Sequence, residues 1–292
     1  MNTEERAELI ESLQSKAAYI RKRICEAANR IGTTMHVGGP LSATDVAVAL
    51  YYKYLGFDPE RLDDPDRNKF ILSKGHNGVL LYNILTDLGL YDWTHIFEGY
   101  NVPGQPFGMH PNRKYIRGIE ASTGSLGHGL PLGLGMAIAN RIDQRASRIY
   151  VMVGDGELQE GSNWEAIMYA GSHQINNLVC IVDNNRGSVA FEYDENLHYD
   201  ISAAFEAFGW EAAEINGNDM GQVVDTFEKL TAIPVDTTSK PTVIVSNTLK
   251  GYGVDFMMDA PRWKWHLGMI NDERLAQAID SIDRGLAEKA AR

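Results

Sequence analysis

The sequence predicts an α/β fold with a mostly parallel central sheet and helices on both faces. Two short apolar runs, IYVMV at 149–153 and LVCIV at 178–182, are rich in valine and isoleucine, and each breaks into a small or polar turn. Helical sequence lies between them, so the three segments indicate a parallel βαβ unit. With 292 residues and 44% hydrophobic content, the chain can bury a sizeable core, in one large domain or two small ones.

The N-terminal segment contains two predicted helices. A long helix is expected over residues 3 to about 30, ended near Gly32, and a second over residues 42 to about 55. We expect Ser42 to cap the second helix, because its hydroxyl can accept a bond from an unpaired backbone N–H group. Asp45 stands at the third position, where the positive end of a helix favours an acid.

A strand, a helix and a long irregular segment come next. Residues 69–72 (KFIL) are predicted to form a short buried strand that leads to the turn 73–76 (SKGH). A helix through 79–89 should stop at its final glycine. Residues 91–122 are rich in glycine and proline and are predicted to be irregular. A loop this long in a compact domain is usually functional or ordered by a partner.

The second half of the chain completes the α/β pattern. Residues 124–139 combine a glycine-rich turn with a helix of small residues, and the βαβ unit follows. Later elements are predicted as a helix at 203–208, a strand at 210–215, a helix at 220–231 and a last strand at 241–246. The tail 251–267 leads to a final helix. Since the sequence has no internal repeat and no low-complexity linker, we predict a single domain over residues 1–292.

Composition and charge restrict the class of protein. The net charge of −12 argues against a general nucleic-acid binder. The two cysteines, Cys25 and Cys180, are far apart in sequence, so we expect reduced thiols in the cytosol. The N-terminus is a charged amphipathic segment without the apolar region of a signal peptide, and no apolar run approaches the length of a membrane span. We therefore expect a soluble, cytoplasmic protein.

The strongest chemical signal lies at the two ends of the βαβ unit. Gly154-Asp155-Gly156 follows the first apolar run, and Asn184-Asn185 follows the second. Parallel strands would place Asp155 and Asn185 together beyond their carboxyl ends, where open α/β sheets bind ligands. A carboxylate and an amide oxygen suit Mg²⁺ or Ca²⁺, and the flanking glycines let the backbone approach a diphosphate. The competing structural interpretation is a strand-to-helix turn with Asp155 as a helix cap.

Four histidines occur in turns rather than on regular apolar faces. They are His36 in MHVGGPLS, His76 in SKGHNG, His110 in FGMHPNR and His266 in WKWHLG. A histidine in a glycine-flanked turn can simply bond to local backbone groups. Four such residues beside a metal motif favour a role in proton transfer instead, because imidazoles titrate near neutral pH.

The stretch from GDG to NN resembles the thiamine diphosphate motif. By that resemblance, Asp155 and the Asn185 side chain hold the metal, and the Gly187 carbonyl completes the protein ligands. The segments MHVGGPLSATD, ILSKGHNGVLLY, FGMHPNRKYIRGIEASTGSLGHG and GDGELQEGSNWEA, in this order, are similar to the N-terminal half of transketolase across nearly the whole chain. The resemblance implies a thiamine diphosphate-binding fold, with Mg²⁺ as the metal and Ca²⁺ or Mn²⁺ as alternatives.

The resemblance also implies roles for individual residues. His36, His76 and His110 would line the substrate channel, and His266 would sit near the cofactor, which His76 also contacts. Around the cofactor, the resemblance further implies contacts from Gly154 and Gly156, from the turn Gly124-Ser125-Leu126 beside the pyrimidine, and from Glu160 near a subunit interface. The segment Arg186-Gly187-Ser188-Val189 departs from the family pattern. Metal binding by a backbone carbonyl survives this change, while the wall over the thiazolium, which includes Val189, is altered.

The family places a cofactor-activating glutamate on a further domain, which this sequence does not match. That domain and the one after it need roughly another 300 residues. The resemblance thus implies the N-terminal subunit of a split transketolase, active only with a C-terminal subunit in a heterotetramer. The reaction would transfer a two-carbon glycolaldehyde unit from a ketose to an aldose. Pentose phosphates are the default substrates, and a sulfosugar or branched sugar phosphate is an alternative.

Three other functions are compatible with parts of this pattern. The α subunit of a 2-oxoacid dehydrogenase also carries GDG and NN, but it is not expected to show SKGH, GMHP and GSLGHG in this order. A synthase that joins pyruvate to a triose phosphate is usually one long chain. A non-catalytic paralogue that binds the cofactor and regulates a partner would have no need of the intact histidine positions.

Overall fold

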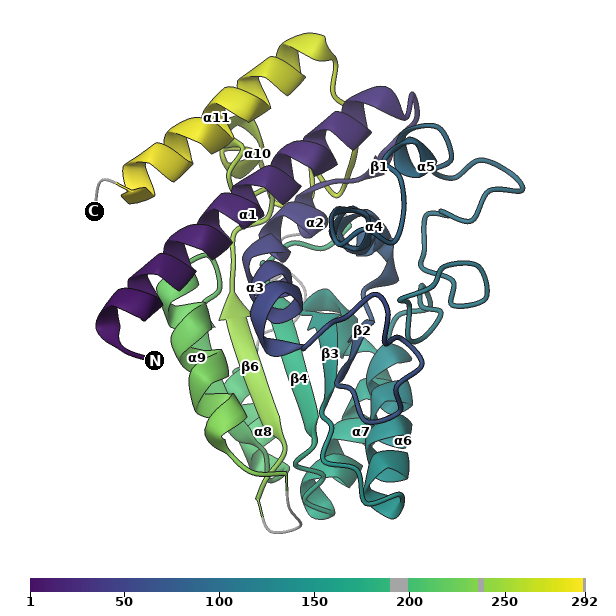
Figure 1. Ribbon diagram of the computed structural model, residues 1–292, viewed down its shortest axis with the longest axis vertical. Coiled ribbons are helices and arrows are strands. Elements are labelled where there is room, and N and C mark those ends of the chain that lie inside the picture. Colours follow the sequence, from purple (N-terminus) through teal and green to yellow (C-terminus); the bar gives the residue numbers. More distant parts are fainter. Residues whose placement is uncertain (190–198, 236–238, 291–292) are drawn as a thin grey trace.

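The computed structural model describes residues 1–189, 199–235 and 239–290, and its centre is a five-stranded sheet (Figure 1). The strands are β2 (Lys69–Leu72), β3 (Ile149–Gly154), β4 (Leu178–Asn184), β5 (Glu211–Asn216) and β6 (Thr242–Asn247). They lie in the order β2-β3-β4-β6-β5, and every neighbouring pair is parallel. The predicted α/β fold with a parallel sheet is confirmed.

Helices and a small second sheet surround these strands. The α-helices are α1 (Thr3–Arg30), α2 (Gly38–Ser42), α3 (Thr44–Ala49), α4 (Gly78–Asp87), α5 (Thr94–Phe97), α6 (Gly129–Ile142), α7 (Gly161–Ser172), α8 (Ile201–Ala207), α9 (Met220–Ala232), α10 (Asp255–Met258) and α11 (Asp272–Ala290). Shorter turns are the π-helical η1 (Leu50–Tyr54) and the 3₁₀ turns η2 (Gly75–Asn77) and η3 (Gly156–Gln159). The second sheet pairs β1 (Met35–His36) with β7 (Leu267–Gly268).

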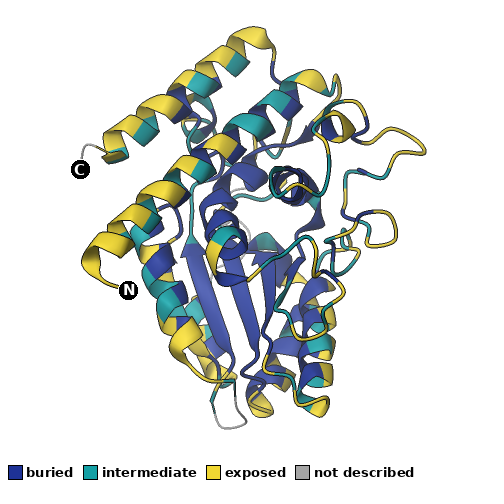
Figure 2. Cartoon of the chain, in the orientation of Figure 1, coloured by how far each residue is buried: buried dark blue, intermediate teal, exposed yellow. Residues whose placement is uncertain are grey.

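The alternation of side chains along the strands creates two apolar cores. On β3, Tyr150 and Met152 face a core that includes side chains of α1, α3, α4 and α9. Val151 and Val153 face a second core, formed with α6, α7 and α8. Figure 2 shows the strands buried between these helical layers. Burial on both faces explains why β3, β4 and β6 are continuous apolar runs rather than alternating ones, whereas the edge strand β5 is largely exposed.

One predicted helix start is wrong. Ser42 does not cap a helix over 42–55; it is the last residue of α2, and α3 begins at Thr44. The Ser42 hydroxyl instead points into the interior, 2.8 Å from the Asp183 carboxylate. Asp45 is also buried, and it accepts two bonds from the Arg21 guanidinium. Contacts with distant segments, and not local capping, therefore fix both side chains.

Most other boundaries agree with the predictions to within a few residues. The irregular segment 91–122 contains the short helix α5, which was not predicted. The two-residue strands of the second sheet were also not predicted. Their antiparallel pairing sets His36 opposite Leu267 and so brings His36 beside His266. Across the described residues, no helix is long and apolar enough to cross a membrane.

Candidate active site

Asp155 and Asn185 meet at the carboxyl edge of the sheet, as the βαβ pattern predicted. Asp155 follows β3, Asn185 follows β4, and the two strands are in register with Gly154 opposite Asp183. The Asp155 carboxylate accepts one bond from the Gly156 N–H group at 2.8 Å. It accepts a second from the Arg186 N–H group at 2.6 Å, which lies in the turn directly after Asn185. The Asp155 side chain thus joins the two predicted halves of the site.

Asp155 is almost fully buried, which changes its acidity. Burial, followed by the nearby Asp183 carboxylate, raises the pKa of Asp155 to about 6. The two backbone N–H groups and the Lys74 ammonium oppose this rise, because they stabilise the ionised form. A divalent cation at this point would favour ionisation further.

The other two predicted metal ligands lie in the same turn. The Asn185 Oδ1 atom accepts a bond from the Gly187 N–H group at 3.1 Å. The Gly187 carbonyl accepts a bond from the Lys250 ammonium at 3.0 Å. The same ammonium lies 2.9 Å from the Ser188 carbonyl and 3.3 Å from His266 Nδ1. Lys250 was not among the predicted site residues, because it lies in a segment (NTLKGYG) without a distinctive motif.

The residues present fit a hard cation bound to an anionic cofactor. A carboxylate and an amide oxygen are adjacent, and both belong to loops with backbone N–H groups turned inward. A Cβ atom added at Gly156 would meet nothing within 4 Å, so there is open space beside Asp155. In the described part of the chain, no group of three or more His, Cys, Asp or Glu side chains forms a metal site of another kind.

Three of the predicted histidines form one cluster. The ring centroids of His36, His76 and His266 are separated by 4.9 to 5.2 Å. Burial is the main cause that lowers the pKa of His36 to about 4 and that of His266 to about 3, with the Lys250 charge as a further cause. Burial also holds the pKa of His76 well below its usual value. All three imidazoles are therefore neutral near pH 7.

His110, in the long irregular segment, lies near enough to His36 for its charge to lower the pKa of that residue. Its ring lies against Gly124, where an added Cβ atom would come within 2.8 Å of a ring carbon. Gly75 makes a similar approach, since a Cβ atom there would lie 2.6 Å from the Gly124 nitrogen. The turns that carry His76, His110 and Gly124 can pack together only because two of these contact positions are glycine. Burial lowers the pKa of His110 as well.

A buried glutamate that the sequence analysis missed holds three site loops together. Glu157 accepts bonds from the Ser73 hydroxyl, from the Gly127 N–H group at 3.0 Å and from the Gly154 N–H group at 3.1 Å. Burial raises the pKa of its carboxyl group. Its position in GDGEL gave no sign of this role, because Ser73 and Gly127 are distant in sequence and the Gly127 and Gly154 donors are backbone N–H groups.

The remaining predicted residues lie at the rim of the site. Ser125 is exposed and Leu126 is half-buried, in the turn that precedes α6. Glu160 is exposed at the start of α7, and its Cβ atom lies close to Gly127. Val189 is 65% exposed and does not cover the site in this chain.

Comparisons with known proteins agree with this geometry. The family model described as transketolase, thiamine diphosphate binding domain, matches residues 13–263. An apulose-4-phosphate transketolase subunit of Actinobacillus succinogenes is 37% identical over 277 residues, which cover 93% of this chain and 96% of that protein. A 6-deoxy-6-sulfo-D-fructose transketolase subunit of a Clostridium species is 34% identical over 245 residues, which cover 84% of this chain and 87% of that protein.

Solved structures show the same relationship for the fold. The transketolase of Campylobacter jejuni superposes with a TM-score of 0.82 at 25% identity. The alignment covers 97% of this chain and 43% of that one, so the chain spans less than half of the solved enzyme. The family match over residues 13–263 and these relatives show that the chain belongs to the transketolase family and corresponds to its thiamine diphosphate-binding domain.

Proposed function

We propose that the chain, over residues 1–292, is the thiamine diphosphate-binding subunit of a transketolase that moves a two-carbon unit from a ketose to an aldose. The observation that carries this proposal is the meeting of two groups at one edge of the sheet. The Asp155 and Asn185 oxygens lie at the ends of β3 and β4. Lys250 connects the turn after β4 to the cluster of neutral imidazoles, because its ammonium contacts both the Ser188 carbonyl and His266 Nδ1.

Mg²⁺ would be held by the Asp155 carboxylate, the Asn185 amide oxygen and the Gly187 carbonyl, with Ca²⁺ or Mn²⁺ as substitutes. The Lys250 ammonium bonds to the Gly187 carbonyl, and a cation on that oxygen would repel the ammonium toward another acceptor. A diphosphate oxygen is a suitable one. When bound, thiamine diphosphate supplies the carbon nucleophile that cleaves the bond beside the ketose carbonyl.

The histidines would bind sugar hydroxyls and move protons. A neutral imidazole has one nitrogen that donates and one that accepts, so it can pass a proton without a charged resting state. His36 has a buried Nδ1 atom without a hydrogen-bond partner among the described residues, which leaves it available to a substrate hydroxyl. We assign the same function to His76 and His266, whose rings contact that of His36, and to His110, which lies near it.

Other positions would contact the cofactor or complete the assembly. The Gly124 backbone and the Leu126 side chain would face the pyrimidine, with Ser125 beside them. Glu160 would lie at a subunit interface, in agreement with its exposure at the start of α7. Val189 would contribute to the cofactor wall only in the assembled enzyme, because it is exposed in this chain.

We also propose a substrate class and a cellular compartment for this protein. The names of the two relatives refer to a sugar phosphate and to a sulfo sugar. We therefore propose a ketose donor that carries a phosphate or sulfo group, with an aldose acceptor; pentose phosphates are the default choice. Both cysteines are free and buried thiols, which agrees with a cytoplasmic protein.

A second subunit of roughly 300 residues, assembled as a heterotetramer, would supply what this chain does not match. The chain covers 34% of the transketolase of Staphylococcus epidermidis, and its more similar relatives are named as subunits. The outer face of α6 is a suitable contact surface, because its first twelve residues, GLPLGLGMAIAN, include no charged residue although Leu132, Gly135 and Ala139 are exposed. Met168 and Tyr169 of α7 extend this apolar face.

The test is a transketolase assay with thiamine diphosphate and Mg²⁺, run on this chain alone, on the candidate partner alone and on the mixture. The proposal predicts turnover in the mixture only. An Asp155→Ala variant of this chain should give an inactive mixture and no Mg²⁺-dependent cofactor binding, because it removes the only charged ligand of the proposed set. If that variant binds the cofactor with unchanged affinity, the metal assignment is wrong. If the mixture of native chains is inactive with a panel of phosphorylated and sulfonated ketoses, the enzymatic proposal is wrong.

A further inference from the structure

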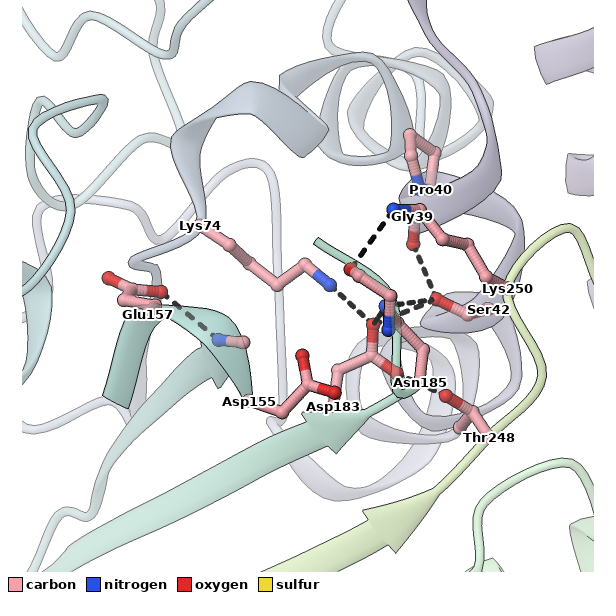
Figure 3. A network of polar contacts seen from close by, with 12 residues as sticks. Gly39, Pro40, Ser42, Lys74, Asp155, Glu157, Asp183, Asn185, Thr248 and Lys250 are labelled. Atoms are coloured by element: carbon pink, nitrogen blue, oxygen red, sulfur yellow. Dashed lines mark hydrogen bonds and ion pairs between the residues drawn. The ribbon is translucent and has the colours of Figure 1, made fainter. Parts of the chain in front are cut away.

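A buried carboxylate lies directly behind the proposed metal site, and the reaction does not explain it. Asp183 is 1% exposed and precedes Asn185 by two residues. Its carboxylate accepts bonds from four side chains of separate segments, drawn together in Figure 3. They are Ser42 at 2.8 Å, Lys74, Asn185 at 3.0 Å and Thr248 at 2.5 Å. We call these five residues the Asp183 network.

The network engages the nitrogen of the Asn185 amide and leaves its oxygen on the other side. The Nδ2 atom donates to Asp183 Oδ2 at 3.0 Å and to the Ser42 hydroxyl at 3.3 Å. Both Nδ2 protons therefore form hydrogen bonds with buried side chains. The Oδ1 atom lies toward the turn, where it accepts the Gly187 N–H group at 3.1 Å.

We infer that Asp183 is a positioning residue that fixes which atom of the Asn185 amide faces the metal. An ionised carboxylate only accepts hydrogen bonds, so it must face the NH₂ group and never the amide oxygen. A cation, in turn, binds the oxygen and is repelled by the NH₂ protons. This inference rests on the metal site proposed above, and it adds a residue that does not touch the metal.

The Lys74 ammonium compensates the charge of the buried Asp183 carboxylate. Its ammonium forms an ion pair with Asp183, and both side chains are at most 2% exposed. The Lys74 ammonium has donor protons and no acceptor, so it can only donate to the Asp183 carboxylate. Thr248 binds the opposite oxygen, Oδ1, and so restrains the rotation of the carboxylate. The side chain therefore stays a fixed acceptor.

The test measures metal binding and does not depend on turnover. Free Mn²⁺ is counted by its electron paramagnetic resonance signal while the chain is titrated in the presence of thiamine diphosphate. Asp183→Asn should raise the apparent Mn²⁺ dissociation constant about 10- to 100-fold, since an asparagine at 183 can present either atom to Asn185. Because this change leaves Lys74 buried without a counter-charge, the double variant Lys74→Met/Asp183→Asn is measured beside it, with the same expected loss.

Two further variants make the experiment decisive. Ser42→Ala removes one acceptor of the Asn185 NH₂ group without changing any charge, and it should weaken Mn²⁺ binding several-fold. Ser246→Ala is the matched control. Ser246 lies opposite Asp183 in the neighbouring strand and is buried, and its hydroxyl has no partner among the described residues. Its Mn²⁺ binding should equal that of the native chain.

The outcomes separate the two proposals. If the native chain fails to bind Mn²⁺ with thiamine diphosphate both alone and mixed with its partner subunit, the proposed metal site is wrong. If the native chain binds and the Ser42 and Asp183 variants bind equally well, the positioning role is overturned. A lower melting temperature with unchanged Mn²⁺ affinity would assign the Asp183 network to folding alone and would overturn the inference in the same way.

Discussion

Burial controls the chemistry of the individual histidines. For His36, His76 and His266, the loss of water is the main cause of a lowered pKa, ahead of the charges of Lys250 and Lys74. An imidazole held neutral near pH 7 has one nitrogen that donates a hydrogen bond and one that accepts. The site therefore holds neutral hydrogen-bonding groups and no extra positive charge beside the lysines.

The contribution of one imidazole can be measured directly. His76→Ala should keep Mg²⁺-dependent binding of thiamine diphosphate but slow sugar turnover of the assembled enzyme by about 10²-fold, the usual scale for a lost acid–base group. Cofactor titration and kcat, measured on the same preparation, separate the two effects. His95→Ala is the control, because His95 is an exposed histidine on α5. Full activity of the His76 variant would reduce that residue to a structural role.

The histidines also predict how stability depends on pH. Folding lowers the pKa of His36 to about 4, below its ordinary value of 6.5. Between these values the unfolded chain takes up a proton that the folded chain refuses, so stability is present above pH 6.5 and is lost as the pH falls toward 4. Between pH 7 and pH 5 the free energy of unfolding should fall by about 2 kcal/mol more in the native chain than in His36→Asn. Urea unfolding at both pH values measures this difference. An equal change in the free energy of unfolding of the two proteins between pH 7 and pH 5 would contradict it.

At the scale of elements, close contact between α6 and β3 depends on one glycine. A Cβ atom at Gly133 would lie 2.3 Å from the Cγ2 atom of Val151, whose branched side chain has little freedom to turn. Gly135, on the same helix, faces open space. The packing of α6 also sets the turn that precedes it, because Gly129 and Gly127 donate to Ser73 and Glu157.

These two glycines form a matched pair for mutation. Gly133→Ala should lower the free energy of unfolding by about 1–3 kcal/mol through overpacking. Gly135→Ala should raise it by about 0.5–1 kcal/mol, because alanine is the better helix former. Denaturant midpoints of the isolated chain measure both changes. The packing argument fails if the two substitutions shift the midpoint in the same direction.

The elements also show which structural features the sequence could predict. Apolar runs with polar breaks identified β2, β3, β4 and β6, since strands buried on both faces leave a strong local pattern. The strands β1 and β7 could not be found this way, because two residues carry no periodicity. Ser42 was misassigned as a helix cap, since its true partner, Asp183, is remote in sequence.

At the scale of the whole molecule, residues of the candidate site were likewise predictable only where a local sequence pattern marks them. Asp155 and Asn185 were predictable because the parallel pairing of β3 and β4 brings the ends of consecutive strands together. The grouping of the histidines came from the family resemblance and not from their spacing. Glu157, Lys250 and the Asp183 network escaped prediction, because each joins segments that only the completed fold brings into contact.

Assembly is the property of the whole molecule that the structure makes testable. The apolar face of α6 and α7 begins at the two turns that hold the candidate site, and it includes Ile142, 75% exposed, and Met168, 41% exposed. This face is the contact proposed above for a second subunit. Ile142→Asp and Met168→Asp should therefore weaken binding of the C-terminal subunit by about 10-fold or more, because a charge must lose its water in the interface.

Size-exclusion chromatography with light scattering measures that association, and Mg²⁺-dependent cofactor binding by each variant chain shows that its fold is intact. Ile233→Asp is the control, because Ile233 is similarly exposed, at 40%, but follows α9 on another part of the surface. Normal assembly of all three variants would exclude the α6–α7 face as the subunit contact. Loss of self-association by this chain, with partner binding retained, would instead assign the face to contacts between two copies of the chain.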